Sequence, residues 1–317
     1  MRKNQWIPWF LILLVWMPVF GKTVNIKKVG EYPNFVALSP DGKTAYVTSY
    51  GTGELIEVDL TRKIVTRAVA IGVAPLGITL ADTGKTAYVA CKESGTIAVV
   101  NLETFRVAAD IKVGGSPNAV AADVRGYRLY VTNFGRTKEG LLHIIDARDY
   151  RVITTMKMGI SPIALAVSPT TESLYVVNGG LNEVWVVDPN RQAVVKKIPV
   201  GDTPDGIAVT PNGERLFVAN SRSNDLSVID AKLGDVMLTI PVGKMPFGVA
   251  VSPDGQQVFV VNTQSRNVSI LPTNLSSLQA KTVSVERGPV GIQVAPDGQT
   301  IVVVNEQSHS LSVVDIR

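Results

Sequence analysis

The 317-residue chain is 45% apolar and only 18% charged, which excludes an intrinsically disordered protein and provides enough apolar side chains for a large core. Its formal net charge is +4, and without Arg2 and Lys3 it falls to +2, too little for the electrostatic footprint of a nucleic-acid-binding protein. The single cysteine, Cys91, excludes an internal disulfide, so the fold must be held by its core.

The first 21 residues have the pattern of an export signal. Arg2 and Lys3 are followed by an apolar stretch from Trp9 to Val19, and the segment ends in the small residue Gly21. The stretch is short for a membrane span, although an uncleaved anchor is the alternative. We expect cleavage after Gly21 and a single mature domain, residues 22–317, in the periplasm or outside the cell. No membrane span is expected after cleavage.

A repeat of 42 to 45 residues fills the rest of the chain. Its units contain four short strand-like runs separated by Gly, Pro, Asp and Asn, which leave no room for a crossover helix. One four-stranded sheet buries its faces poorly alone, so seven sheets must pack around an axis. The sequence predicts an all-β, seven-bladed β-propeller with four antiparallel strands per blade. The repeat is marked by prolines in matching context: Pro33, Pro75, Pro117, Pro162, Pro204, Pro246 and Pro289.

The two ends of the repeat region complement each other. The last unit stops at Leu311–Ile316, which aligns with a third strand, and Val24–Val29 resembles the fourth strand of another unit. We expect the N-terminal strand to complete the last blade and close the ring, which would remove two exposed sheet edges.

The second strands of the units carry the most recognisable motif. They include Tyr46-Val47-Thr48-Ser49, Tyr88-Val89-Ala90-Cys91 and Tyr130-Val131-Thr132-Asn133, and Ser-Pro-Asp-Gly turns recur before them. Over residues 22–317 the chain therefore resembles the YVTN-repeat β-propeller family. The resemblance implies the fold, but this family includes surface-layer proteins, binding proteins and relatives of lactonase-like and cytochrome d1-type domains, so it leaves the function open.

Acidic residues in the turns are interpreted as structural. Asp or Asn before Gly, as in Asp41-Gly42 and Asp254-Gly255, is what a tight hairpin needs for its positive φ and for local capping. The same role is expected for the acids that end third strands: Asp59, Asp146, Asp188, Asp230 and Asp315.

The binding surface is predicted at the central mouth, on the face with the fourth-to-first and second-to-third strand loops. The residue after each repeated proline should line this mouth, and the loop residues should surround it. The predicted ligand-binding residues are Asn34, Asn118, Asp205 and Phe247 at the mouth, with Tyr32, Tyr50, Lys92, Phe134, Arg287, Glu306 and His309 around it.

Departures from the repeat carry further information. Blade three has three extra residues within Phe134–Gly140, on the mouth face. Cys91 replaces the asparagine present at five of seven equivalent positions, and we interpret it as a buried small residue rather than a nucleophile. His143 is placed inside a third strand, between blades.

Three classes of function are compatible with these residues. The favoured one is a binding or interaction scaffold that holds a protein partner or small molecule at the mouth, and no cofactor is required by the sequence. The second is a periplasmic enzyme or cofactor-binding propeller of lactonase, lyase or haem d1 type. His309 could then be a haem ligand or general base. No metal site is assigned, although four groups form the only obvious ligand set: Asn34, Asn118, Asp205 and Glu306.

Binding of single-stranded nucleic acid is the third class. It would stack bases on the mouth aromatics and contact phosphates through nearby cations. The net charge of +2 disfavours it, and we do not expect a nucleic-acid partner. The residues that it would use are Tyr32, Tyr50, Phe134, Phe247, Lys92, Arg136, Lys244 and Arg287.

Overall fold

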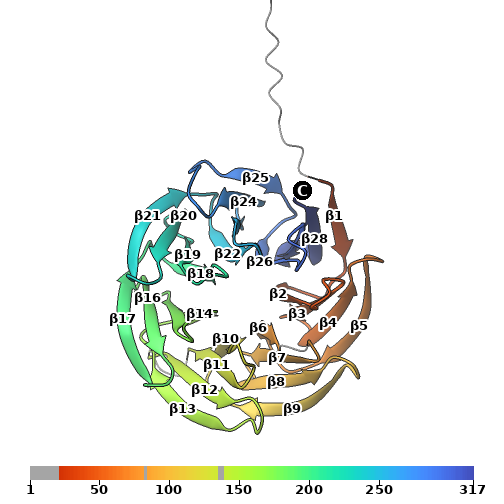
Figure 1. Ribbon diagram of the computed structural model, residues 1–317. Coiled ribbons are helices and arrows are strands. Elements are labelled where there is room, and N and C mark those ends of the chain that lie inside the picture. The colour runs from red at the N-terminus through yellow and green to blue at the C-terminus, as the bar shows by residue number, and fades with distance from the viewer. Residues whose placement is uncertain (1–20, 82–83, 135–138) are drawn as a thin grey trace, which may run out of the picture.

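A computed structural model describes residues 21–81, 84–134 and 139–317, which form seven four-stranded antiparallel sheets arranged as blades around one axis (Figure 1). The predicted all-β seven-bladed propeller is confirmed. None of the helices among these residues has the length and apolarity to cross a membrane. The predicted export signal lies outside the described residues, apart from Gly21.

In blades one to six the strands run in chain order from the axis outward. Blade one consists of β2 (Pro33–Leu38), β3 (Thr44–Ser49), β4 (Glu54–Asp59) and β5 (Ile64–Ala70), and blade two of β6 (Pro75–Leu80), β7 (Thr86–Cys91), β8 (Thr96–Asn101) and β9 (Arg106–Lys112). Blade three has β10 (Pro117–Ala122), β11 (Arg128–Asn133), β12 (Leu141–Asp146) and β13 (Val152–Lys157). Blade four has β14 (Pro162–Val167), β15 (Leu174–Asn178), β16 (Glu183–Asp188) and β17 (Ala193–Pro199).

Blades five and six follow the same order, and blade seven takes its outer strand from the N-terminal end of the described chain. Blade five has β18 (Pro204–Val209), β19 (Arg215–Asn220), β20 (Asp225–Asp230) and β21 (Asp235–Pro241). Blade six has β22 (Pro246–Val251), β23 (Gln257–Asn262), β24 (Asn267–Pro272) and the short β25 (Lys281–Ser284). Blade seven has β26 (Pro289–Val294), β27 (Thr300–Asn305), the 3₁₀ turn η1 (Glu306–Ser308) and β28 (Ser310–Asp315), and its outer strand is β1 (Thr23–Lys27).

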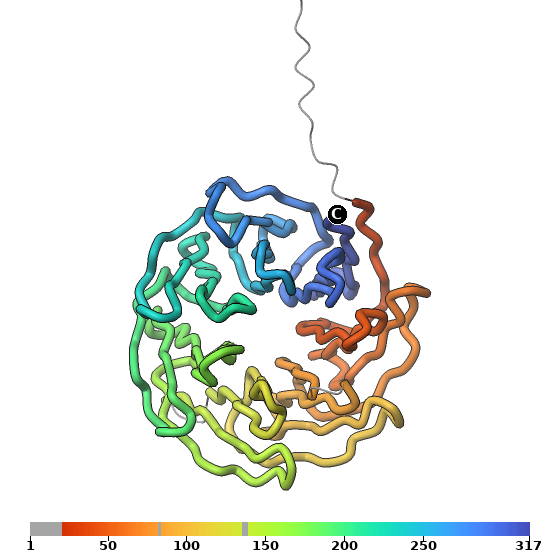
Figure 2. The backbone as a smooth tube through the Cα atoms, viewed as in Figure 1, coloured from red at the N-terminus to blue at the C-terminus, as the bar shows by residue number. Residues whose placement is uncertain are grey.

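The ring closes through the two ends of the chain, as predicted. Strand β1 pairs with β28 from Thr23 opposite Val314 to Lys27 opposite Ser310. Figure 2 shows the start of the described chain beside its C-terminus. Ile26 is 3% exposed and Val29 is fully buried, so the closing segment contributes to the core as well as to the sheet.

Glycines near the axis allow the innermost strands of neighbouring blades to approach. A Cβ atom on Gly206 would lie 2.0 Å from the carbonyl oxygen of Phe247, and one on Gly291 would lie 2.5 Å from that of Asn34. A larger side chain at either position would push the next inner strand away. This contact explains why glycine recurs two residues after the repeated proline in four blades.

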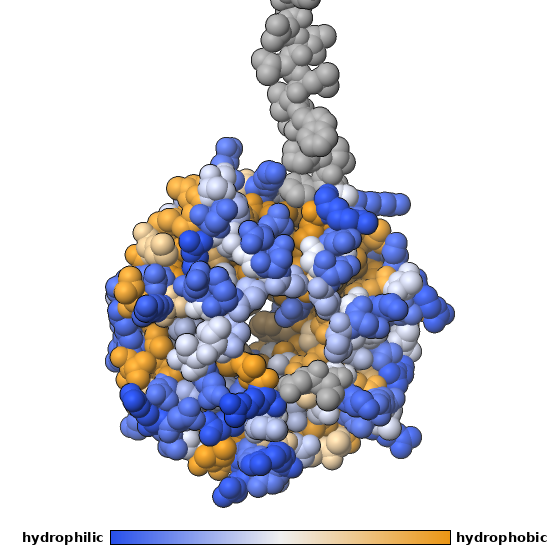
Figure 3. Space-filling model, viewed as in Figure 1, coloured by the Kyte–Doolittle hydropathy of each residue, from blue (hydrophilic) through white to orange (hydrophobic). Residues whose placement is uncertain are grey.

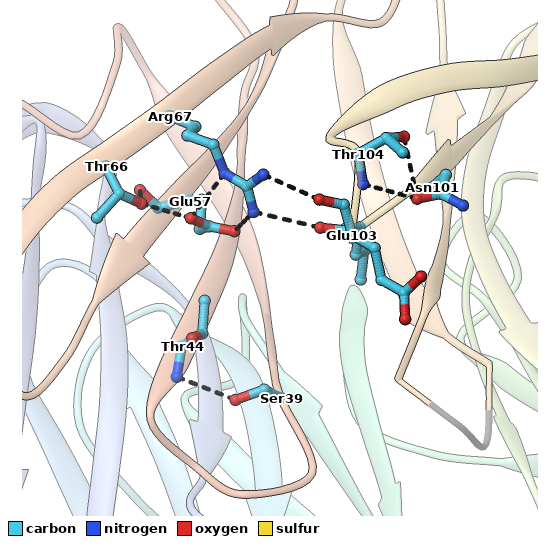
Figure 4. Close-up of polar contacts among 9 residues, drawn as sticks. Ser39, Thr44, Glu57, Thr66, Arg67, Asn101, Glu103 and Thr104 are labelled. Atoms are coloured by element: carbon cyan, nitrogen blue, oxygen red, sulfur yellow. Dashed lines mark hydrogen bonds and ion pairs between the residues drawn. The ribbon is translucent and has the colours of Figure 1, made fainter.

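Neighbouring blades pack their apolar faces against each other, and hydrogen bonds between blades add to this packing at the periphery. Arg67 of blade one donates from Nε to Glu57 Oε1 (3.0 Å) and from its Nη atoms to the backbone carbonyls of Glu103 (3.3 Å) and Leu102 (3.2 Å) in blade two (Figure 4). Its guanidinium also lies 4.5 Å from the centre of the Phe105 ring. Arg67 therefore links the outer parts of blades one and two.

The turns between first and second strands, and between third and fourth strands, lie on the face opposite the mouth, which we call the turn face. Asp41 Oδ1 accepts from the Lys43 N–H (3.1 Å), and Gly42 has φ of +69°. Asp230 Oδ1 accepts from the Lys232 (2.9 Å) and Leu233 (2.8 Å) N–H groups. The structural interpretation of these acids is confirmed.

Candidate functional site

The inner strands surround an open centre, which appears as a hollow in the middle of the ring (Figure 3). A central cavity of about 190 Å³ lies there, lined by residues of all seven innermost strands, among them Phe35, Ile163, Asp205 and Phe247. The phenyl ring of Phe35 stands where four other blades have glycine. The centre is therefore narrow and mostly apolar, with Asp205 as the one carboxyl group in its lining.

A larger cavity of about 660 Å³ opens beside the centre, where blades six, seven and one meet. We call it the mouth cavity. Its apolar part comes from Phe247 and Val290, which follow the repeated prolines, and from Met245. Because Phe247 also lines the central cavity, it lies between the two. The remaining lining residues are Asn34, Lys244, Thr263, Gln264, Arg266, Glu306 and Gln307.

Glu306 is the carboxyl group of the mouth cavity. It begins η1, directly after the buried Asn305, and Asn34 Nδ2 donates to its Oε1 (3.4 Å). Burial raises the pKa of Glu306, while the Asn34 hydrogen bond and nearby His309 act in the opposite direction. A partly desolvated carboxyl group here can accept a hydrogen bond from a ligand or take up a proton.

Asp205 is the matching carboxyl group of the central cavity. It lies in β18, and burial raises its pKa, against a smaller effect of the Ser221 hydroxyl. The two mouth-face carboxyls thus share one physical cause for their altered pKa, namely loss of water.

Two cations of the mouth cavity have no acidic partner. Lys244 and Arg266 are exposed, and neither takes part in any ion pair among the residues that the structure describes. Their charge is therefore available to an anionic ligand.

A third cavity, of about 430 Å³, adjoins the mouth cavity on its outer side, between blades six and seven. We call it the rim cavity. It shares Arg266 and Gln307 with the mouth cavity, and its other lining residues are Lys27, Val285, Glu286, Arg287, Ser308 and His309. The predicted site residues Arg287 and His309 therefore lie together.

His309 and Tyr32 are in ring contact at the edge of this cavity. Their centroids are 5.3 Å apart, and His309 Nδ1 lies 3.2 Å from the Gly30 carbonyl oxygen and 3.4 Å from the Tyr32 nitrogen. With Nδ1 engaged by the backbone, Nε2 is the nitrogen that can contact a ligand.

Other predicted site residues lie apart from these cavities or serve the fold. Lys92 lies over the Phe134 ring (5.6 Å) between blades two and three, and Tyr50 donates its N–H to the Tyr32 carbonyl (3.1 Å). Asn118 Nδ2 donates to the Ile163 carbonyl (2.5 Å), so its amide joins blades three and four. Residues 135–138 of the blade-three insertion lie outside the described residues.

The four groups considered as a metal-ligand set are not gathered. Only Asn34 and Glu306 are in hydrogen-bond contact, whereas Asn118 is engaged by the backbone and Asp205 lines the central cavity. Across residues 21–81, 84–134 and 139–317, no three His, Cys, Asp or Glu side chains are close enough together to hold a metal ion.

His143 and Cys91 are buried inside blades. His143 accepts from Asn133 Nδ2 at Nε2 (3.0 Å) and contacts Thr155 Oγ1 through Nδ1 (2.9 Å), and burial lowers its pKa. Cys91 is fully buried, and burial raises its thiol pKa to about 12. Both match the structural interpretation that the sequence favoured.

Sequence reasoning missed several residues of the mouth cavity. Met245, Thr263, Gln264 and Gln307 lie in loops with no motif, and nothing in the repeat distinguishes them. Arg266 did carry a signal. It stands directly before a third strand, where five of the other blades have Gly or Asn.

Comparison with known proteins adds a family and a fold neighbour. The family model described as "Lactonase, 7-bladed beta-propeller" matches residues 35–246. The solved structure of hydrazine synthase from Kuenenia stuttgartiensis superposes with a TM-score of 0.82 at 20% identity, covering 92% of this chain and 97% of that chain. At this identity the likeness shows the fold alone. No curated protein sequence matches the chain significantly.

Proposed function

Since the chain belongs to the seven-bladed β-propeller lactonase family, we propose that it binds a small molecule with an apolar body and an acidic group in the mouth cavity. One observation supports this most strongly. A cavity of about 660 Å³ brings together three apolar side chains, a half-buried carboxyl group and two cations that form no ion pair in the described part of the chain. Small-molecule sites typically have volumes of roughly 300–1,000 Å³. The mouth cavity lies in this range, with three apolar and seven polar or charged lining residues, so polar contacts should carry much of the recognition.

Each group has a distinct part in this binding. Phe247 and Val290 pack against the apolar body, and Lys244 or Arg266 pairs with the acidic group. Glu306, held by Asn34, accepts a hydrogen bond from a hydroxyl or amine of the ligand. The seven-bladed ring serves as a rigid frame, so binding needs little rearrangement of the backbone.

The family match ends at Pro246, between Met245 and Phe247 of the mouth cavity. Residues 35–246 leave out five lining residues to which the proposal gives a part: Asn34, Phe247, Arg266, Val290 and Glu306. The binding groups therefore come largely from the part of the ring that the family model does not cover. The ligand is accordingly inferred from these side chains rather than from the family.

The test starts from protein purified without denaturation from its native compartment. Mass spectrometry of the small molecules that it releases should find one bound compound, and its affinity is then measured for variants. Phe247→Ala and Glu306→Gln should each weaken binding by about tenfold or more, because each removes a buried contact worth about 1.5 kcal/mol or more. The turn-face control Lys43→Ala with Gln256→Ala should change affinity less than twofold. Loss of binding in the control alone would place the site on the turn face and refute the proposal.

A second function, hydrolysis of a cyclic ester, is supported by the family and by Glu306. A general base works best when its pKa approaches the working pH, and burial moves the pKa of Glu306 in that direction. In this reaction Glu306 takes a proton from water, the water oxygen attacks the ester carbon, and the ring C–O bond breaks. Glu306 returns its proton to the leaving alkoxide to give the hydroxyl, and the new carboxylic acid ionises to a carboxylate and releases one proton to the solution.

Proton release from simple γ- and δ-lactones tests this second function. Glu306→Gln should remove most of the activity while Glu103→Gln, an exposed turn-face change, keeps it. Equal rates in both variants, or no turnover by the parent protein, would leave binding as the function.

We further propose that the mature protein begins at Lys22 and acts in the periplasm or outside the cell, since residues 1–21 have the export pattern. N-terminal sequencing of the exported protein should begin at or near Lys22. Retention of Met1 would contradict this.

A further inference from the structure

The residue before each third strand adopts a left-handed backbone conformation in six of the blades. Blades one, two, four and five use residues suited to it, Gly53, Gly95, Asn182 and Asn224, with φ between +57° and +74°. Blades six and seven instead have Arg266 (φ +54°) and His309 (φ +50°). Both adopt this conformation at an energetic cost that glycine or asparagine would avoid.

These two exceptions stand in adjacent blades, and their side chains line one cavity. Arg266 and His309 both line the rim cavity, together with Arg287 from the loop between β25 and β26. Two independent departures from the repeat therefore place a guanidinium and an imidazole around the same space.

The charges around the rim cavity do not balance. Glu286 is its only carboxyl group, and both its oxygens are engaged, one by Lys27 and the other by Ser310. Arg266 and Arg287 make no ion pair anywhere in the described part of the chain. With Lys27 and Glu286 compensating each other, two guanidinium charges remain.

A hydroxyl group is also available there. Ser308 Oγ accepts from the Arg287 N–H (2.9 Å), so its own O–H proton can be donated to a bound group. Two guanidinium forks and a hydroxyl donor around a small cavity are suited to the oxygens of a phosphate or carboxylate.

We propose that the rim cavity is an anion subsite in which Arg266, Arg287 and Ser308 hold the phosphate or carboxylate group of a small ligand. Because Arg266 and Gln307 line both cavities, the subsite continues into the mouth cavity, and the body of the same ligand would lie on Phe247. The identity of the whole ligand rests on the proposed function, whereas anion binding at the rim does not.

Inorganic phosphate and acetate, titrated separately at constant ionic strength by isothermal titration calorimetry, test the subsite in the mature protein. We expect saturable binding of at least one of them, and the preferred anion identifies the acidic group. Arg287→Gln should weaken binding by about tenfold or more, since a charge-assisted hydrogen bond is lost. Glu286→Gln should strengthen it, because Lys27 is released to the anion.

Arg266→Asn is the most informative variant. It installs the residue that blades four and five have at this position, so it should fold at least as stably as the parent while losing anion affinity about tenfold. The matched control is Arg106→Gln, an exposed arginine of β9 that makes no ion pair among the described residues and should bind the anion as the parent does.

Phe247→Ala separates this proposal from the proposed function. It should leave phosphate or acetate binding unchanged even if it abolishes binding of the complete ligand. Absence of saturable binding of either anion, or equal losses in Arg266→Asn, Arg287→Gln and Arg106→Gln, would overturn the subsite.

Discussion

The two faces of the ring use charged residues in opposite ways. On the turn face, hydrogen bonds from the Ser39 hydroxyl and the Lys43 N–H lower the pKa of Asp41, and the Arg317 side chain lowers that of Asp315 to about 2. On the mouth face, burial raises the pKa of Glu306 and of Asp205, and Arg266 and Arg287 form no ion pair among the described residues. Turn-face acids stabilise the fold, whereas Glu306 and Asp205 on the mouth face are held at a cost that a ligand can offset.

The repeat itself follows the same division. The turn-face acids recur from blade to blade because every hairpin needs them. The mouth-face groups are exceptions that occur once, and three of them, Arg266, Glu306 and His309, lie in the second-to-third strand loops of blades six and seven. In a repeat protein we therefore expect the binding surface on the face where several residues depart from the repeat.

The largest expected effect comes from breaking the frame that both faces share. Deleting residues 22–30 removes β1 and the buried Ile26 and Val29, and it leaves β28 as an open edge. Loss of two buried aliphatic side chains alone costs about 4 kcal/mol or more, so the melting temperature should fall by more than about 10 °C, or folding should fail. Removal of residues 1–21 alone is the control. An unchanged melting temperature after the longer deletion would contradict the blade assignment.

Removing one turn-face acid should have a moderate effect. Asp254 accepts hydrogen bonds from the Ser252 hydroxyl and the Gln256 N–H, and Asp254→Ala should cost about 1 kcal/mol at pH 7. Those hydrogen bonds lower its pKa in the folded protein, so the contribution is present above pH 4 and is lost as pH falls below it. Urea unfolding of parent and variant at pH 7 and pH 3 should therefore give a difference that shrinks at pH 3. A difference that grows at pH 3 would be inconsistent with a structural carboxylate.

On the mouth face the sign should reverse. The raised pKa of Glu306 means that its favourable contribution exists below pH 4 and is lost as pH rises, since the ionised group is poorly solvated. Glu306→Gln should raise the melting temperature at pH 7 slightly, by about 1–2 °C, and leave it unchanged at pH 4. Destabilisation at pH 7 would assign Glu306 to the frame rather than to the site.

The smallest expected effect concerns Cys91, a departure from the repeat that lies in neither face. Because the thiol is fully buried with its pKa at about 12, the native protein should not react with a thiol reagent within hours, and guanidinium-unfolded protein should react completely. Rapid labelling of the native protein would show that Cys91 is accessible and would group it with the mouth-face residues that depart from the repeat.

The repeated proline, its period and the strand alternation were enough to predict seven blades and the closing strand, because each blade must satisfy the same packing and hydrogen-bonding rules. The close approach of Gly206 to the next inner strand also recurs with the repeat, because glycine stands two residues after the repeated proline in four blades. Side-chain use was less predictable. Asn34 and Asn118 follow equivalent prolines, yet Asn34 contacts Glu306 and Asn118 is taken up by the Ile163 carbonyl.

Arg266 shows what further sequence reasoning could have found. Gly or Asn at the equivalent position of other blades indicates that the backbone there is left-handed. An arginine at such a position is therefore an anomaly that the sequence alone can reveal. The grouping of Met245, Gln264 and Gln307 with it depends on how loops of neighbouring blades meet, and no local pattern encodes this.

Methionine methyl signals give the most direct test of ligand binding at the mouth cavity. Met245, 39% exposed, lines the mouth cavity, Met237, 49% exposed, lies on the outer strand β21, and Met158 is fully buried. In a protein labelled at methionine methyl groups, adding the small-molecule fraction released from natively purified protein should shift the Met245 signal and leave the other two in place. A shift of Met237 with Met245 unchanged would contradict the account.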